Sequence, residues 1–143
     1  MKITRHGSAV WSGGLKDGKG AISTESGALK AHPYGFASRF EGVPGTNPEE
    51  LIAAAHAGCF TMALSLILGE AKLTVEKLET SAKVTLEKVE GGFAITAVHL
   101  TLGAKIPGAD QATLERLAGV AKAGCPVSKV LKAEITLNAT LIS

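Results

Sequence analysis

The chain contains only two cysteines, Cys59 and Cys125, and each has a defined place relative to a predicted helix. Cys59 lies inside an almost wholly apolar stretch that begins at Leu51. Cys125 precedes Pro126, a residue suited to the first position of a helix, so Cys125 is the predicted N-cap. Because the thiolate is a strong nucleophile, two thiols in defined helix contexts suggest redox chemistry in a chain with few other reactive groups.

The two thiols are expected to differ in acidity. Burial in an apolar helix would raise the pKa of Cys59 and leave it inert, unless a cation or a hydrogen-bond donor lies nearby. His56, one turn earlier on the same helix face, is one candidate, and a residue from elsewhere is another. At a helix start the exposed amides and the helix dipole stabilise a thiolate, so local physics alone favours Cys125 as the more acidic thiol.

Two other interpretations of the cysteines stay open. Both could be inert thiols that fill space in the core of a non-catalytic domain. His56, Cys59 and Cys125 could also supply three ligands to a zinc ion, although no CxxC or HxxxH pair and no fourth ligand is apparent. The chain carries no phosphate loop, dinucleotide fingerprint or nucleophile elbow, so no cofactor is expected.

The composition is that of one globular domain over residues 1–143. The chain has 143 residues, 45% of them hydrophobic and 20% charged, with a net charge of +2. Acids and bases are mixed and aromatic residues make up only 4%, which argues against a nucleic-acid partner. The first six residues lack the apolar core of a signal peptide, and two cysteines are too few for a secreted disulfide scaffold. We expect a cytoplasmic protein with reduced thiols.

Residues 51–68 contain no charged side chain, which reaches the threshold for a membrane span. The stretch is rich in alanine and includes His56, Thr61 and Ser65, so we interpret it as a helix buried on all sides and not as a membrane span. Thr46 or Asn47 is the expected N-cap, with Pro48 at the first helical position. A chain this short has few elements to cover such a helix, which argues for an oligomer.

The remaining pattern predicts an α+β fold. Strands are expected at residues 8–11, 20–24 and 35–40, and then at 75–89 and 93–102, with Gly91 and Gly92 as a hairpin turn between the last two. An amphipathic helix is expected at residues 110–123. A short helix from 125 to 132 and a closing strand from 134 to 142 follow. Strands and helices do not alternate regularly, which argues against a βαβ repeat.

Several segments resemble the osmotically inducible protein C and organic hydroperoxide resistance protein family. Two cysteine motifs carry the resemblance: Asn47-Pro48-Glu49-Glu50-Leu51 leading to Cys59-Phe60, and Gly124-Cys125-Pro126-Val127-Ser128. Shorter matches extend it over essentially the whole chain: Ser23-Thr24-Glu25-Ser26-Gly27, Tyr34-Gly35-Phe36, Arg39-Phe40-Glu41-Gly42 and Phe93-Ala94-Ile95-Thr96. The chain looks similar to the osmotically inducible branch of this family.

The resemblance implies a thiol-dependent peroxidase of the stress response that reduces organic hydroperoxides, and hydrogen peroxide less well. It implies an intertwined homodimer with strands flanking a long buried central helix. Cys59 would be the peroxidatic cysteine and Cys125 the resolving one, so that a Cys59 sulfenic acid gives way to a Cys59–Cys125 disulfide. This reverses the local preference for Cys125 as nucleophile. The disulfide would be reduced by an external dithiol, for which a lipoylated protein is a candidate.

The resemblance also implies roles for Glu49 and Arg39. Glu49 matches the active-site glutamate of the family, and Arg39 matches the arginine that the osmotically inducible branch carries at the end of a strand. The sister branch has its arginine in the early glycine turn, where residues 13–19 of this chain hold only lysines as bases. Arg39 would stabilise the Cys59 thiolate, and Glu49 would hold the guanidinium in a bidentate pair.

Glu49 and Cys59 lie ten residues apart in one predicted helix. At about 1.5 Å per residue this separates them by roughly 15 Å along the axis, and about 100° per residue places them some 80° apart around it. Two such residues cannot meet within one straight helix. If both line one pocket, either the helix breaks between them or one of them comes from another chain.

Overall fold

The structure, a computed structural model, describes residues 1–143, which form two compact units. The N-terminal unit comprises residues 1–51 and the C-terminal unit residues 52–143. Each unit has a three-stranded sheet of its own.

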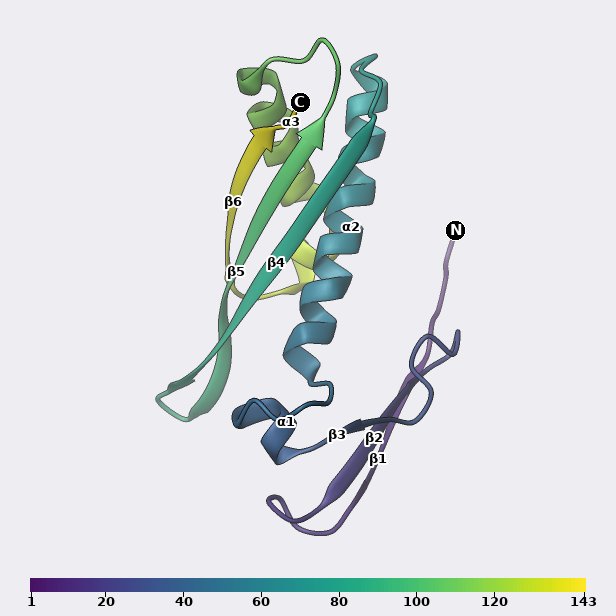
Figure 1. The fold of residues 1–143 in the computed structure, drawn as a ribbon, viewed down its shortest axis with the longest axis vertical. Coiled ribbons are helices and arrows are strands. Elements are labelled where there is room, and N and C mark those ends of the chain that lie inside the picture. The colour runs from purple at the N-terminus through teal and green to yellow at the C-terminus, as the bar shows by residue number, and fades with distance from the viewer. The chain divides into compact units, whose positions relative to one another are not determined.

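The sheet of the N-terminal unit is antiparallel, with β2 in the middle (Figure 1). It consists of β1 (Gly7–Ser12), β2 (Lys19–Thr24) and β3 (His32–Tyr34). Trp11 of β1 and Tyr34 of β3 meet edge to face, with ring centroids 5.6 Å apart. The strands predicted at residues 8–11 and 20–24 are therefore confirmed.

The strand predicted at residues 35–40 is wrong, because Phe36–Phe40 forms the short helix α1. The backbone N–H of Gly35 donates to the Ser38 hydroxyl at 2.9 Å, which closes the first turn. Helical spacing also brings the rings of Phe36 and Phe40 together, with centroids 5.0 Å apart. Short-range capping and an i, i+4 aromatic pair thus outweigh the strand propensity of the phenylalanines.

The helix α2 (Pro48–Glu70) runs without interruption for 23 residues. Asn47 caps it, since its side-chain oxygen accepts from the backbone N–H of Glu50 at 2.7 Å. Pro48 is the first helical residue, and Glu49 and Glu50 follow in the first turn, where carboxylates favour the helix dipole. The helix start predicted from the sequence is confirmed.

The sheet of the C-terminal unit has the order β4-β5-β6 (Figure 1). The strands β4 (Lys77–Val89) and β5 (Gly92–Lys105) form the predicted hairpin, and Gly91 takes the φ of 93° that its turn requires. The helices α3 (Gln111–Gly124) and α4 (Pro126–Val130) then lead to β6 (Glu134–Leu141), which pairs in parallel with β5. The predicted α+β class is confirmed.

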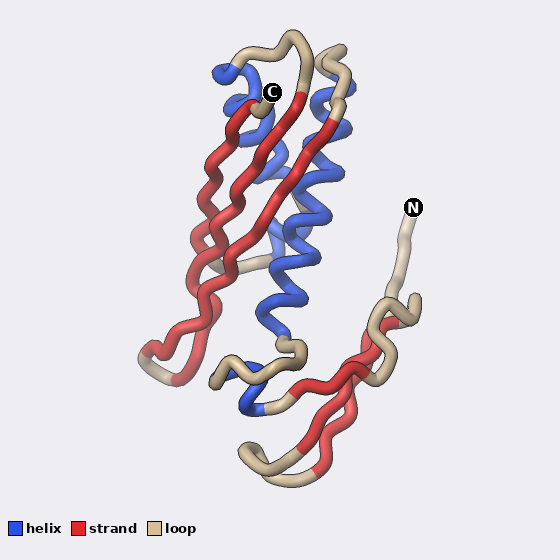
Figure 2. The backbone as a smooth tube through the Cα atoms, viewed as in Figure 1, coloured by secondary structure: helices blue, strands red, loops and turns tan.

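One core holds the C-terminal unit together. Alternate residues of β5 from Val98 to Ala104 are buried, and they face side chains of α2 and α3 that include Phe60, Leu64 and Leu114. The two long helices lie on the same side of the sheet (Figure 2). The burial of these apolar side chains fixes α2 against β5, and so fixes the position of Cys59.

The single chain does not bury α2 on all sides, and the expectation that a partner subunit supplies the remaining cover stays a prediction. Only one stripe is fully buried, namely His56, Phe60, Leu64 and Leu68. Met62 and Leu66 lie on the opposite side and are 75% and 65% exposed. By length and composition α2 is the one helix that could cross a membrane, but the core helix of a soluble protein passes the same test, and this stripe belongs to the core of its unit.

Candidate active site

The thiols of Cys59 and Cys125 lie side by side in the C-terminal unit. Cys59 is in the middle of α2 and is partly buried, whereas Cys125 is the N-cap of α4 and is fully buried. The two sulfur atoms are hydrogen bonded at 2.9 Å, and both cysteines are free. A disulfide needs a separation of about 2.05 Å, so oxidation of this pair would require only a small movement of the two sulfur atoms. Residues 66 positions apart in the sequence thus form a dithiol.

The surroundings of the sulfurs favour a charge on Cys125. Burial opposes ionisation of this thiol, but hydrogen bonds from Cys59, Ser128 and Val127 outweigh it and lower the pKa of Cys125. Burial raises the pKa of Cys59, and its hydrogen bond with Cys125 raises it further. In the single chain Cys125 is therefore the more acidic thiol, as the helix start had indicated.

His56 does not serve as a cation for Cys59. Its ring is fully buried, and its Nε2 lies 2.7 Å from the Ser128 hydroxyl. Burial lowers the pKa of His56 below 6.5, so the ring is neutral at pH 7. No group of three or more His, Cys, Asp or Glu side chains is arranged to hold a metal ion. The zinc interpretation therefore has no ligand cluster to support it.

Arg39 and Glu49 form a second pair, which belongs to the N-terminal unit. The guanidinium binds the carboxylate in a fork, with Nη2 2.7 Å and Nε 3.0 Å from Oε1 and Nε 3.3 Å from Oε2. Such two-point contacts fix the plane of the guanidinium as well as its position. Arg39 remains 37% exposed, whereas Glu49 is 12% exposed, so the carboxylate is the anchored partner.

An apolar cavity of about 160 Å³ adjoins this ion pair. Arg39 is its one charged lining residue; the others include Trp11, Leu15, Tyr34, Phe36 and Phe40. The guanidinium carbon of Arg39 also lies 5.3 Å from the ring centre of Phe40. A cation at the edge of an aromatic cavity suits a ligand with one polar and one apolar end.

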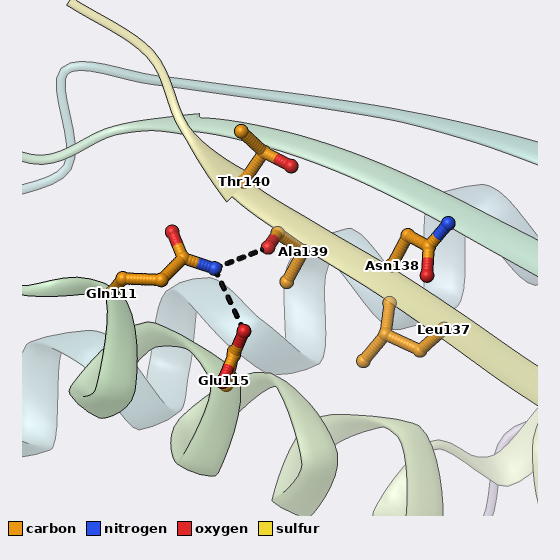
Figure 3. Close-up of a pocket in the computed structure, with 6 residues that line it drawn as sticks. All are labelled: Gln111, Glu115, Leu137, Asn138, Ala139 and Thr140. Atoms are coloured by element: carbon orange, nitrogen blue, oxygen red, sulfur yellow. Dashed lines mark hydrogen bonds between the residues drawn. The ribbon is translucent and has the colours of Figure 1, made fainter.

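A larger cavity, of about 480 Å³, lies between α3 and the outer edge of β6 (Figure 3). It is lined by Gln111, Glu115 and residues 137–140, and so contains neither thiol. Its lining also includes neither Arg39 nor Glu49. This cavity therefore lies away from the residues with chemistry, whereas a cavity of about 530 Å³ beside α2 is lined by Ala57 and Gly58, which precede Cys59.

The sequence does not single out Ser128, although this residue belongs to the second cysteine motif. Ser128 is three residues after the N-cap Cys125, the spacing at which a side chain turns back to a helix start. That spacing was the only available signal, since nothing in the sequence indicates that His56 would meet Ser128 across 72 residues.

The fold and the thiol pair define a class of protein: an α+β domain with two free thiols in contact. Known proteins are similar to this chain in sequence and in fold. The family model described as OsmC-like protein matches residues 40–140. The chain is 57% identical over 143 residues, 100% of both proteins, to peroxiredoxin OsmC of Escherichia coli strain K12. It is 33% identical over 101 residues to the organic hydroperoxide resistance protein of Xanthomonas axonopodis pv. citri, which covers 70% of this chain and 69% of that one.

The solved structure of the organic hydroperoxide resistance protein OhrB of Bacillus subtilis has a TM-score of 0.72 and 29% identity, and covers 96% of this chain and 98% of that one. The chain belongs to the OsmC-like protein family. The family expected from the two cysteine motifs is thereby confirmed.

Proposed function

We propose that this chain is a thiol-dependent peroxidase that reduces organic hydroperoxides, and hydrogen peroxide less well. The observation that carries the proposal is the pair of free thiols 2.9 Å apart, in a chain 57% identical to a peroxiredoxin. Inert core thiols or a zinc site would not require two sulfurs in hydrogen-bond contact. The whole of residues 1–143 would act as one peroxidase domain.

Cys59 is the peroxidatic cysteine in this proposal. Its thiolate attacks the distal oxygen of the peroxide, the O–O bond breaks, and an alcohol leaves after taking up a proton. Cys59 is left as a sulfenic acid. Cys125 then attacks the Cys59 sulfur, a disulfide forms and water leaves. An external dithiol reduces the disulfide, and a lipoylated protein is a candidate donor.

The acidity of the thiols indicates what Cys59 lacks in the single chain. Its pKa is raised by burial, so it needs a nearby positive charge to become the nucleophile. Arg39 supplies that charge in our proposal, with Glu49 holding its guanidinium in the orientation that contacts the peroxide oxygens. The apolar cavity beside Arg39 would receive the organic part of the hydroperoxide.

We propose further that the active site is composite. Because α2 is continuous from Pro48 to Glu70, no break in the helix brings Glu49 to Cys59. Ten residues of helix rise about 15 Å, so a site that uses both would take them from different chains. The protein would then be a cytoplasmic homodimer, in which Cys59 and Cys125 of one chain meet Arg39 and Glu49 of the other. The exposed apolar side of α2 would be covered by the partner.

A thiol titration tests the chemistry. One equivalent of tert-butyl hydroperoxide should remove both free thiols of the wild-type chain and leave an intramolecular disulfide. Cys59→Ser should abolish peroxide reduction. Cys125→Ser should allow a single oxidation that traps a sulfenic acid at Cys59. If the Cys59→Ser chain still consumes peroxide while Cys125→Ser does not, the two roles are reversed.

A further inference from the structure

A fully buried polar residue, His56, lies next to the thiol pair with only one of its ring nitrogens engaged. Its Nε2 is 2.7 Å from the Ser128 oxygen, while its Nδ1 has no hydrogen-bond partner and no access to solvent. A neutral imidazole carries its one proton on either nitrogen. A buried N–H without an acceptor is rarer in proteins than a buried acceptor without a donor. The tautomer with its proton on Nε2 is therefore favoured.

This tautomer decides which way the Ser128 hydroxyl points. When the Nε2–H of His56 donates to the Ser128 oxygen, the hydroxyl proton is free to donate elsewhere. Ser128 shares the first turn of α4 with Cys125, and hydrogen bonds from its backbone N–H and its side chain help to lower the pKa of Cys125. The opposite tautomer would draw the hydroxyl proton toward the imidazole and away from the sulfur.

We propose that His56 and Ser128 are positioning residues, in which His56 orients the Ser128 hydroxyl so that it donates a hydrogen bond to the Cys125 thiolate. The Nε2 of His56 is 2.7 Å from the Ser128 hydroxyl, Ser128 shares the first turn of α4 with Cys125, and the sulfur of Cys125 is 2.9 Å from that of Cys59. Neither His56 nor Ser128 touches the peroxide. Their effect falls on the resolving thiol.

The inference deepens the proposed function and rests on Cys125 being the resolving cysteine. In that step Cys125 loses its proton, and its thiolate attacks the sulfur of the Cys59 sulfenic acid. The S–S bond forms, the S–O bond breaks with its electron pair, and the departing hydroxide takes up one proton to leave as water. A hydroxyl directed at Cys125 keeps a larger share of the thiol ionised before the attack.

The first test reads the tautomer directly in the wild-type reduced protein. Nitrogen-15 chemical shifts of the His56 ring should show a proton on Nε2 and a bare Nδ1. A proton on Nδ1 would overturn the proposal, because Ser128 would then donate to the imidazole. The measurement needs no peroxide turnover, so its result is independent of whether the chain is a peroxidase.

The second test measures the pKa of Cys125 by thiolate ultraviolet absorbance in a Cys59→Ser background. Ser128→Ala and His56→Leu should each lower the acidity of Cys125 by about tenfold, one pH unit. Ser128→Thr keeps the hydroxyl, and His56→Gln places an amide N–H near the position of Nε2, so both should retain most of the acidity. Thr61→Val is the matched control: it removes a hydroxyl of α2 that bonds Ala57 and Thr80, and should leave Cys125 unchanged.

A third measurement links the pair to the proposed step. In chains that keep both cysteines, His56→Leu and Ser128→Ala should slow disulfide formation more than sulfenic acid formation, by up to about tenfold. An unchanged pKa of Cys125 in folded Ser128→Ala would overturn the proposal. If the pKa shifts as expected but no peroxide is consumed, the proposed function fails while the positioning role stands.

Discussion

Cys59 and Cys125 have different surroundings although their sulfur atoms are in hydrogen-bond contact. Cys59 lies on an apolar helix, and burial raises its pKa. Cys125 begins a helix, and hydrogen bonds from Cys59, Ser128 and Val127 outweigh its burial and lower its pKa. Within one chain Cys125 is therefore the more acidic thiol, although our proposal makes Cys125 the resolving cysteine and Cys59 the nucleophile. A peroxidatic Cys59 requires an external cation, and this makes Arg39 the residue on which the proposal depends most.

Replacement of Arg39 tests that requirement. Arg39→Ala removes the cation and should lower kcat/KM for an organic hydroperoxide by about 100-fold, as loss of one donor to a developing oxyanion does elsewhere. Arg39→Lys keeps the charge but loses the fork that binds Glu49, so it should remain well below wild type. Stopped-flow peroxide consumption gives both rates. Wild-type rates in both variants would exclude Arg39 from the site.

His56 should make stability depend on pH. Burial lowers its pKa in the folded chain below 6.5, while in the unfolded chain the pKa stays near that value. On acidification the unfolded chain therefore takes up the proton first. The contribution of neutral His56 to the free energy of unfolding is therefore full above about pH 6.5. It falls as the pH drops toward the pKa of the folded chain, by at most about 1.4 kcal/mol per pH unit.

Urea unfolding at a series of pH values and fixed protein concentration measures this dependence. The free energy of unfolding should decrease between pH 7 and pH 5 in the wild-type chain, and the decrease should be smaller in His56→Gln, which has no ionisable group at this position. If the free energy of unfolding depends equally on pH in the two proteins, protonation of His56 does not cause the loss of stability.

At the scale of elements, α3 protects the exposed edge of the C-terminal sheet. Only one side of β6 pairs with β5, so its other side presents free backbone groups. The side chain of Gln111 covers two of them. Its Nε2 donates to the Ala139 carbonyl at 2.6 Å (Figure 3). Its Oε1 accepts from the Leu141 N–H at 3.2 Å. Lys122 donates to the Ile135 carbonyl at 3.3 Å on the same strand. Covered edges are less prone to pair with other chains.

Gln111→Leu keeps the size of the side chain but removes both contacts. We expect the free energy of unfolding to fall by about 1 to 2 kcal/mol, because two hydrogen bonds are lost and each contributes about 0.5 to 1.5 kcal/mol net. Glu115→Gln is the matched control, because it can still accept from Gln111 and leaves the contacts with β6 intact. Denaturant unfolding at equal concentration should separate the two variants. If Gln111→Leu is as stable as wild type, water satisfies the free backbone groups of β6 as well as the Gln111 amide does.

At the scale of the whole molecule, the apolar side of α2 calls for a partner. Met62 and Leu66 are exposed on a helix whose other side belongs to the core. Met62→Glu should place a charge in the proposed dimer interface, and yield a monomer with little peroxidase activity. Val120→Glu makes the same change at an exposed position of α3, and should leave both the mass and the activity unchanged. Sedimentation velocity gives the masses, and a fully active monomer would contradict the composite site.

A mixed dimer tests the composite site itself. A Cys59→Ser chain and a Glu49→Ala chain are each expected to be inactive alone. When they are co-expressed with different affinity tags, the heterodimer should contain one intact site and regain about half of the wild-type activity per dimer. A Cys59→Ser chain paired with a Cys125→Ser chain is the control. Both cysteines of a site come from one chain, so this second heterodimer should regain nothing.

Elements that depend on neighbouring residues could be predicted from the sequence alone. Asn47 and Pro48 predicted the start of α2, Gly91 the hairpin, and Pro126 the position of Cys125 at a helix start. These features follow from caps, turns and the fixed φ of proline, which act over a few residues. The two cysteine motifs also identified the family, because their residue types are unusual in combination. Short-range signals failed at residues 35–40, where capping by Ser38 competes with strand propensity.

Contacts between distant residues could not be predicted in this way, because they depend on how the elements pack in three dimensions. The contact between the sulfurs of Cys59 and Cys125 depends on packing α2 and the α3–α4 segment against one sheet, and no local pattern encodes it. The same packing brings His56 to Ser128 and leaves Nδ1 without a partner. It also decided that α2 is buried on one side only. Burial is a property of the assembled surface, so a uniformly apolar helix cannot by itself indicate which face its own chain will cover.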